Sequence, residues 1–285
     1  MNDNNITKRV TVNAMEKILG QEFSVLDKGF VRVIDYMGDD NAIVQAARIS
    51  YGQGTKHVNQ DKALIRYLMR NRHTSPFEMC EIKLHFKLPL FVAQQWLRHR
   101  TAHINAYSGR YSEMPDEFYY PNKDVLQMQS TSNKQGRDGK LSESIKDEIL
   151  QNMQNDSEMC YETYQKFLNL GVTRELARNN LTFNIYTSWY WKIDVHNLLH
   201  FLRLRCDSHA QYEIRQYANQ IKEILKIWMP ITYEAFCDYC QNGVYLSHEA
   251  LKVVKAKLNN EKYEPDTTKL GKRELQELME ILNIN

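Results

Sequence analysis

The chain has 285 residues and a formal net charge of +2, from 37 Lys and Arg against 35 Asp and Glu. That length allows one large domain with a substantial core, and the near-neutral charge excludes a globally basic nucleic-acid coat or an acidic disordered tail as the main identity. Eleven Gly and six Pro are about half the usual combined share of these residues, which favours long helices over a turn-rich β-sandwich.

The N-terminal residues are polar and the apolar stretches are short, so neither a signal peptide nor a transmembrane helix is expected, and we expect a cytoplasmic protein. The five cysteines are odd in number and widely spread. A chain of this size does not depend on disulfides, so reduced thiols are expected. Cys237 and Cys240 form a C-x-x-C pair with no second pair at zinc spacing, which favours ordinary helix packing over a metal site.

The first part of the chain is predicted to carry most of the strands. Alternation of apolar residues around Lys28 and Gly29 indicates a hairpin, and alternation of apolar with basic or polar residues after Glu78 indicates a strand. In chain order we expect a hairpin over 23–36, a helix after Asp39 and Asp40, a helix over 61–70, a strand over 78–88, a helix from Pro89 to about Leu97 and a loop over 98–110.

The rest of the chain is predicted to be mainly helical. Residues 121–141 are rich in Gln, Ser, Asn, Lys and Gly, which predicts an exposed, mobile excursion rather than a domain linker. The aromatic run Phe183–Trp191 is compatible with a strand. Helices are predicted over 142–169, 173–181, 194–206, 208–228, 231–241, 247–259 and 272–283.

The charge is unevenly placed. Between Glu81 and Glu113 lie 31 residues without an Asp or Glu, and this acid-free stretch holds five basic residues: Lys83, Lys87, Arg98, Arg100 and Arg110. Close-set arginines repel one another unless an anion or a carboxylate lies between them. The stretch is therefore a candidate anion site, and the alternative is a solvated basic loop paired with acids elsewhere in the fold.

A glycine loop for phosphate binding is absent. The sequence has no G-x-x-x-x-G-K-[ST], and its sole G-x-G, Gly52-Gln53-Gly54, is followed by His57 where a third glycine would belong. Any phosphate must then be held mainly by side chains, for which the planar fork of Arg is well suited. In an extended loop Arg98 and Arg100 project to the same side.

An arginine follows an apolar stripe further along the chain. Val195, Leu198, Leu199 and Leu202 have helical spacing, and Arg205 continues the same stripe. A guanidinium on the core side of a helix is costly without a partner, so Arg205 is a functional candidate, and the alternative is a frayed helix end where it bends into water.

A parallel polar stripe holds His196, His200 and Arg203. Histidines four residues apart can bind zinc, with His209 or Asp207 as a third ligand, but Asn197 replaces the Glu of H-E-x-x-H. A metal hydrolase on these histidines is one alternative. An RNA-binding module is another, in which the basic loop is joined by stacking tyrosines: Tyr107, Tyr111, Tyr119 and Tyr120.

Three ordered segments resemble one family. Arg98-His99-Arg100, seven further residues and then Ser108 resemble the R-H-R-x7-S signature of flavin-dependent thymidylate synthases. The run 202–215 (LRLRCDSHAQYEIR) is similar to that family's C-terminal motif, and the run 73–78 (HTSPFE) is similar to an upstream motif.

The resemblance implies a helix-rich α+β domain over residues 22–241 with a small, mostly antiparallel sheet, and a helical extension over 242–285. It also implies a homotetramer, with active sites shared between subunits, that methylates dUMP to dTMP. Methylenetetrahydrofolate would supply the carbon and FAD reduced by NADPH the hydride, with no cysteine nucleophile. No resident metal, nucleic-acid partner or membrane association is implied.

The site residues carried over from the resemblance are one catalytic position and two binding sets. Arg205 resembles the catalytic position proposed to favour ionisation of uracil N3. The cofactor-binding set is Ser75, Arg98, His99, Arg100, Ala106, Asp194, Val195, His196 and His200. The dUMP-binding set is Gln95, Arg98, Tyr107, Ser108, Gly109, Arg110, Arg178 and Arg205.

The chain departs from the family pattern at the flavin-facing positions. Ala106 stands where many members carry Glu, and Asp194, His196 and His200 stand where other members carry Asn or Arg. Because a carboxylate has no donor, Asp194 cannot reproduce an amide's hydrogen bond.

Overall fold

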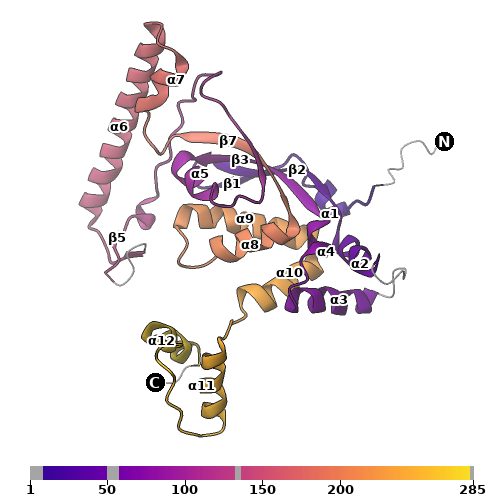
Figure 1. The fold of residues 1–285 in the computed structure, drawn as a ribbon. Helices are drawn as coiled ribbons and strands as arrows, with labels where there is room; N and C mark the ends of the chain where they lie inside the picture. Colours follow the sequence, from indigo (N-terminus) through magenta and orange to yellow (C-terminus); the bar gives the residue numbers. More distant parts are fainter. Residues whose placement is uncertain (1–8, 50–57, 132–135, 283–285) are drawn as a thin grey trace, which may run out of the picture. The chain divides into compact units, whose positions relative to one another are not determined.

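The computed structural model describes residues 9–49, 58–131 and 136–282. The chain divides into two compact units, residues 1–236 and 237–285 (Figure 1). The larger unit holds a five-stranded sheet and most of the helices. The Gly52-Gln53-Gly54 run lies outside the described residues.

The central sheet is antiparallel throughout, and its strand order is β1-β2-β3-β7-β4. The expected hairpin is confirmed, since β1 pairs with β2 through Val25 and Gly29. The helix-rich α+β fold with a small antiparallel sheet is likewise confirmed. The strands are β1 (Glu22–Val25), β2 (Gly29–Met37), β3 (Glu81–Pro89), β4 (His103–Ala106) and β7 (Tyr186–Asp194), with a separate small pair, β5 (Met128–Gln129) and β6 (Arg137–Asp138).

Three helices of the larger unit, α2, α6 and α8, start at a polar capping residue. Asp39, Ser142 and Asp194 each accept a hydrogen bond from a backbone N–H in the first turn of the helix that follows. The helices are α1 (Asn13–Glu16), α2 (Asp40–Arg48), α3 (Val58–Arg70), α4 (Ser75–Glu78), α5 (Leu90–Trp96), α6 (Glu143–Asn169), α7 (Arg174–Ala177), α8 (Val195–Arg205), α9 (Tyr212–Trp228) and α10 (Pro230–Phe236), with short 3₁₀ turns η2 (Lys123–Val125) and η3 (Arg178–Asn180).

The main core lies between the sheet and helices α5, α8 and α9, which lie along one of its faces (Figure 1). An aromatic cluster fills the centre, where the Trp96 ring stacks on Phe201 with 4.6 Å between centroids and meets Trp191 edge-on at 5.3 Å. Both tryptophans and Phe201 are fully buried. These rings hold the end of α5 against α8, and the residues that follow α5 are thereby fixed beside α8.

A buried carboxylate ties α2 to the start of α10. Asp40 accepts hydrogen bonds from the backbone N–H of Ile231 at 2.9 Å and from the N–H and hydroxyl of Thr232 at 2.9 and 2.6 Å. Burial nevertheless raises the pKa of Asp40. Capping from a distant segment satisfies the N-terminal donors of a helix whose own sequence begins with Pro230.

Several element boundaries differ from the predictions. The main correction is β4, because residues 103–106 were expected in a loop and instead pair with β7 at the sheet edge. This strand shows no alternation of buried and exposed residues, so periodicity could not reveal it. Pro89 is both the last residue of β3 and the N-cap of α5, so the helix expected from Pro89 starts one residue later, at Leu90. Phe183 precedes its strand, which starts at Tyr186.

The polar excursion is mostly exposed, as predicted, but its described part is anchored. Lys123–Val125 form a 3₁₀ turn, and β5 pairs with β6. Arg137 of β6 forms an ion pair with Glu213 at the start of α9, with 2.8 Å between nitrogen and oxygen. The expectation of free mobility did not include this link to the core.

The smaller unit begins with a π-helical turn, η4 (Cys237–Gln241), and contains α11 (His248–Leu258) and α12 (Lys272–Ile281). Ala250, Val253, Leu270 and Leu278 form its buried core. Neither cysteine of the C-x-x-C pair forms a disulfide. The helix expected over 231–241 is therefore an α-helix only to Phe236 and a π turn beyond it.

Candidate functional site

Arg205 has a buried partner. Its Nε donates a hydrogen bond of 2.9 Å to Nε2 of His99, which lies in the turn after α5. Arg205 ends the buried stripe of α8 and is half-buried, so the guanidinium turns toward the protein rather than bending into water. Within the described residues no carboxylate forms an ion pair with Arg205, and its positive charge is left for a ligand.

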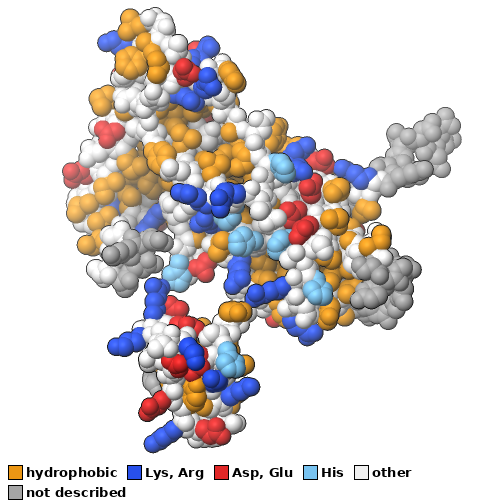
Figure 2. Space-filling model, viewed as in Figure 1, with side chains coloured by type: hydrophobic (Ala, Val, Ile, Leu, Met, Phe, Trp, Pro, Cys, Tyr) orange, Lys and Arg blue, Asp and Glu red, His pale blue; other side chains and the backbone are white. Residues whose placement is uncertain are grey.

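Two arginines of the R-H-R signature are exposed beside this pair. Arg98 and Arg100 point outward while His99 is buried, which confirms the predicted alternation. Among the described residues neither arginine makes an ion pair. On the face of the larger unit shown in Figure 2, Lys and Arg side chains gather next to several His side chains. An anion approaching Arg98 and Arg100 would meet cations that no acid within the described ranges neutralises.

The other basic residues of the acid-free stretch behave differently. Lys87 pairs with Glu117 at 2.6 Å, and Arg110 pairs with Glu175 at 3.0 Å. Both acids come from outside the stretch. The alternative of a basic loop paired with acids elsewhere therefore holds for Lys87 and Arg110, and the anion-site hypothesis is strongest for Arg98 and Arg100.

A second group of predicted residues forms around Ser108 and comprises Tyr107, Ser108, Gly109, Arg110 and Arg178; we call it the Ser108 group. Gly109 is buried, and a side chain at its position would meet Arg178 at 3.2 Å and the sulfur of Met114 at 2.7 Å. Glycine thus lets Arg178 of η3 lie directly against the loop. Ser108 Oγ accepts a hydrogen bond from the Arg110 N–H at 3.3 Å.

The remaining nucleotide-binding candidates are Gln95, Arg98 and Arg205, and together with the flavin-binding candidate His99 they form what we call the Arg205 group. Gln95 lies one turn before His99, and its buried Oε1 has no hydrogen-bond partner among the described residues. An unpaired buried carbonyl is costly unless a ligand satisfies it. In the described part of the chain, no hydrogen bond, ion pair or ring contact joins the Arg205 group to the Ser108 group.

Four of the flavin-binding candidates, Asp194, Val195, His196 and His200, lie at the cap or in the first turns of α8. Asp194 caps the helix by accepting from the Asn197 N–H at 2.9 Å and from the Asn197 side-chain amide at 2.6 Å. Val195 is fully buried and its N–H donates to the Cys80 carbonyl, so its side chain faces the core. His196 is partly exposed and His200 is exposed. Ser75 is the exposed first residue of α4, which packs against α8, and Ala106 is the exposed last residue of β4.

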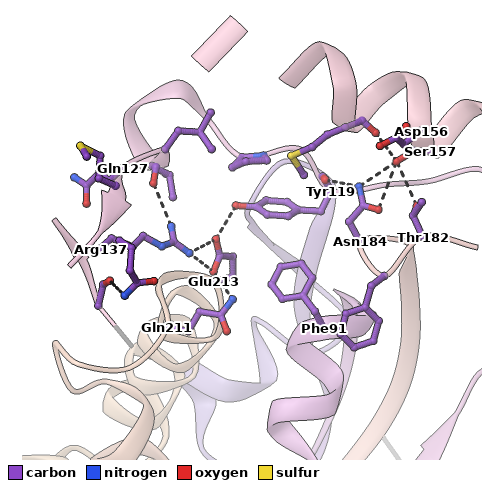
Figure 3. Close-up of a pocket in the computed structure, with 18 residues that line it drawn as sticks. Phe91, Tyr119, Gln127, Arg137, Asp156, Ser157, Thr182, Asn184, Gln211 and Glu213 are labelled. Atoms are coloured by element: carbon purple, nitrogen blue, oxygen red, sulfur yellow. Dashed lines mark hydrogen bonds and ion pairs between the residues drawn. The ribbon is translucent and has the colours of Figure 1, made fainter. Parts of the chain in front are cut away.

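Sequence reasoning missed a polar network on α9. Glu213 is buried, and its carboxylate accepts from Arg137, from Gln211 Nε2 at 2.9 Å and from the Tyr119 hydroxyl at 3.3 Å (Figure 3). A cavity of about 540 Å³ adjoins this network, and Phe91 is in its wall. The sequence does contain a signal for this network, because Glu213 is a charged residue on the apolar stripe of α9, four residues before the buried Tyr217. Arg205 is likewise a charged residue on the apolar stripe of α8.

Comparison with known proteins now bears on this arrangement. A profile of the thymidylate synthase complementing protein family matches residues 32–231. The chain is 57% identical over 283 residues to the flavin-dependent thymidylate synthase of Ehrlichia ruminantium (strain Welgevonden), covering 99% of this chain and 95% of that protein. The chain belongs to the flavin-dependent thymidylate synthases. The family enzyme of Rickettsia conorii is 54% identical over 290 residues, covering 97% of this chain and 99% of its own length.

A solved structure extends this likeness to the fold. The UMP/dUMP methylase PolB from Streptomyces cacaoi, bound with 5-Br dUMP, superposes with a TM-score of 0.71 at 30% identity and covers 78% of this chain and all of that one (100%). Membership of the flavin-dependent thymidylate synthases favours the enzyme hypothesis over the RNA-binding alternative.

Cys80 is not an activated nucleophile. Burial, followed by the charges of Asp39 and Asp40, raises the pKa of Cys80 to about 12, and its thiol donates weakly to the Asp39 carbonyl at 3.8 Å. A thiol with that pKa is almost wholly protonated near neutral pH. Cys206, next to Arg205, is partly buried and forms no disulfide.

The metal alternative has no matching geometry in the part of the chain that the structure describes. There, no group of three or more His, Cys, Asp or Glu side chains is placed to hold a metal ion. His209 instead pairs with Asp207 at 2.8 Å. Searched over the same residues, none of the helices combines the length and apolar character needed to span a bilayer.

Proposed function

We propose that the protein converts dUMP to dTMP by reductive methylation, with 5,10-methylenetetrahydrofolate as the carbon donor and FAD, reduced by NADPH, as the hydride donor. The observation that carries the proposal is the likeness of the chain, over nearly its whole length, to flavin-dependent thymidylate synthases. The PolB structures, bound with 5-Br dUMP and 5-Br UMP, support a pyrimidine nucleotide as the substrate. A location in the cytoplasm is part of the same proposal.

The charged residues of the described site suit this substrate. The Ser108 group offers a hydroxyl, the backbone at Gly109, the guanidinium of Arg178 and the terminal nitrogens of Arg110, whose Nε is engaged by Glu175. Together these donors suit a phosphate. Arg205 would lie against the uracil ring. A cation beside N3 lowers the pKa of that nitrogen, and the resulting negative charge makes C5 a better nucleophile toward the incoming carbon.

The donor set also fits FAD. Arg98 and Arg100 are exposed and without ion pairs among the described residues, so both forks can contact a pyrophosphate. When bound, FAD supplies the hydride that reduces the transferred carbon to a methyl group. Arg98, Arg100 and the α8 residues would bind and orient it, with His196 and His200 as possible donors, while Asp194 is already engaged as the helix cap.

The reaction as proposed needs no cysteine. The pKa of Cys80 near 12 fits a mechanism in which C5 is activated through Arg205 rather than through a thiolate attached to the ring. Ser108 would hydrogen-bond the nucleotide and form no bond to carbon.

We further propose a homotetramer in which the Ser108 group of one subunit and the Arg205 group of another form one site. Among the residues that the structure describes, no hydrogen bond, ion pair or ring contact joins the two groups, and the four residues of β4, about 13 Å of strand, lie between Arg100 and Tyr107. Residues 22–241 would form the shared enzymatic domain and 242–285 a helical extension.

The function is tested first by colour and product. Purified protein should be yellow, and with dUMP, methylenetetrahydrofolate and NADPH it should form dTMP and oxidise NADPH only when dUMP is present. Absence of dTMP after confirmed flavin loading contradicts the proposal. Salt-sensitive oligonucleotide binding by a colourless protein would instead favour the RNA-binding alternative.

Shared sites are tested by mixing inactive variants. Arg205→Ala and Ser108→Ala should each be nearly inactive, but when they are co-expressed about a quarter of the sites would combine an intact Ser108 with an intact Arg205. Recovery of activity supports sharing between subunits. A co-expressed mixture as inactive as the separate variants would show that both residues come from the same chain.

A further inference from the structure

His99 is held in one orientation by its surroundings. The residue is 9% exposed, and its backbone N–H donates to the Trp96 carbonyl at 2.9 Å. Its ring meets Phe201 edge-on, with 4.8 Å between centroids, and Phe201 stacks on Trp96. The imidazole therefore has little freedom to turn away from Arg205.

The hydrogen bond fixes the protonation state of His99. An arginine Nε always carries hydrogen, so the His99 Nε2 that lies 2.9 Å away must be an acceptor. The ring is then neutral, with its proton on Nδ1. Burial, then the positive charge of Arg205 and the nearby His200, lowers the pKa of His99 to about 4, in agreement with this geometry.

The groups around His99 all favour the neutral ring. Arg205 and His200 approach from α8, and Arg98 and Arg100 flank it in its own segment. Among the described residues no carboxylate lies within ion-pair distance of the ring. Protonation would place an N–H of His99 against the N–H of Arg205 and break the bond.

The hydrogen bond to His99 leaves the two terminal guanidinium nitrogens of Arg205 available to a ligand. With Nε engaged, the plane of the guanidinium is set, and its two terminal nitrogens have no hydrogen-bond partner among the described residues. An arginine side chain that is free to rotate would have to be ordered each time a ligand binds. Here the ordering is built into the fold.

We propose that His99 is a positioning residue for Arg205: its unprotonated Nε2 orients the guanidinium so that the terminal nitrogens face the pyrimidine ring of the substrate. This inference rests on the proposed function, because it takes Arg205 to contact dUMP. It gives the middle residue of the R-H-R signature a task different from flavin binding, which the resemblance implies.

Two substitutions separate these tasks. Gln at position 99 can place an amide oxygen near the position of Nε2, whereas Asn reaches only the position of Nδ1. His99→Gln should keep kcat/KM for dUMP within about five-fold of the parent, and His99→Asn should lower it by about 100-fold, the effect of a misplaced catalytic group. The opposite order, with Asn active and Gln inactive, would show that the Nδ1 donor matters and would overturn the inference.

A double-mutant cycle gives the second readout. In protein that already carries Arg205→Ala, His99→Asn should change dUMP affinity, measured by calorimetry, by less than about three-fold, because the group that it positions is gone. Equal losses with and without Arg205 would overturn the inference. Flavin content, measured by absorbance in every variant, shows whether His99 acts on flavin binding instead.

The parent protein gives a readout that needs no variant and no turnover. Nitrogen NMR of isotope-labelled histidine should show one residue, assigned by its loss in His99→Gln, with Nε2 unprotonated down to about pH 5. Titration with the midpoint of an ordinary histidine would overturn the inference. If this signature and the Arg205 coupling are both found but no dTMP forms, the proposed function fails and the positioning role stands.

Discussion

Replacement of Glu213 by Gln should destabilise the larger unit substantially. The Glu213 side chain is 4% exposed, and its two oxygens each lie 2.8 Å from an Arg137 nitrogen. Tyr119 donates to the same carboxylate, and burial together with Glu213 raises the pKa of Tyr119, so that it stays a donor. The substitution removes the charge that these groups surround but keeps the size of the side chain.

The magnitude follows from the burial of the two partners. Removing one member of a fully buried ion pair costs about 3–5 kcal/mol. The Arg137 side chain is 34% exposed and can turn partly to water, which lowers the cost. An amide at position 213 also keeps one acceptor for Tyr119 or Gln211. We therefore expect the free energy of unfolding to fall by about 2–3 kcal/mol.

Urea unfolding of the parent and the variant measures this difference. The matched control is Asp147→Asn, which breaks the pair between Asp147 and Lys123, whose side chains are 59% and 45% exposed. That loss should stay below about 0.5 kcal/mol, as for other surface pairs. If Glu213→Gln also costs less than about 0.5 kcal/mol, the network is not a buried charge pair in solution and the reasoning is refuted.

Three other changes have defined outcomes. Gly38→Ala should lower the free energy of unfolding by about 2–4 kcal/mol, because φ is +87° and the new methyl would lie 2.5 Å from the Cys80 sulfur. The control Gly171→Ala, at φ +83° with no neighbouring atom within 4 Å of the new methyl, should lower it by about 1 kcal/mol in the same urea assay. Cys206→Ser should keep dTMP formation, and an inactive variant that binds dUMP normally would indicate a covalent role. The pKa of His99 is lowered to about 4, so as the pH falls from about 6.5 to about 4 the unfolded chain takes up a proton that the folded chain does not. The free energy of unfolding should therefore decrease as the pH is lowered through that range, and it should decrease less in His99→Gln.

Residues that interrupt an apolar stripe were the most informative part of the sequence. Arg205 was found because a charge continues the stripe of α8, and the structure gives it the partner that this position requires. Glu213 sends the same signal on α9, but no partner could be named, because Arg137 lies 76 residues away in a polar segment. Pairing across such a separation depends on the tertiary fold.

Boundaries and edge strands were less accessible from the sequence. Strand β4 lies at the edge of the sheet, and three of its four side chains are exposed. It therefore has no alternation of buried and exposed residues from which a strand could be predicted. Val195 shows a different limit. Resemblance placed it among flavin-binding residues, whereas the structure buries its side chain in the core. A motif identifies positions near a ligand and does not say which of them turn toward it.

Strand β4 also constrains how the chain can vary in length. Its pairing with β7 fixes His103 opposite Lys192 and Ala106 opposite Trp189. Deletion of one residue between Arg100 and Tyr107 would displace one side of the site by about 3.3 Å and turn every side chain of the strand to the other face. We therefore expect insertions and deletions between Arg100 and Tyr107 to be rejected.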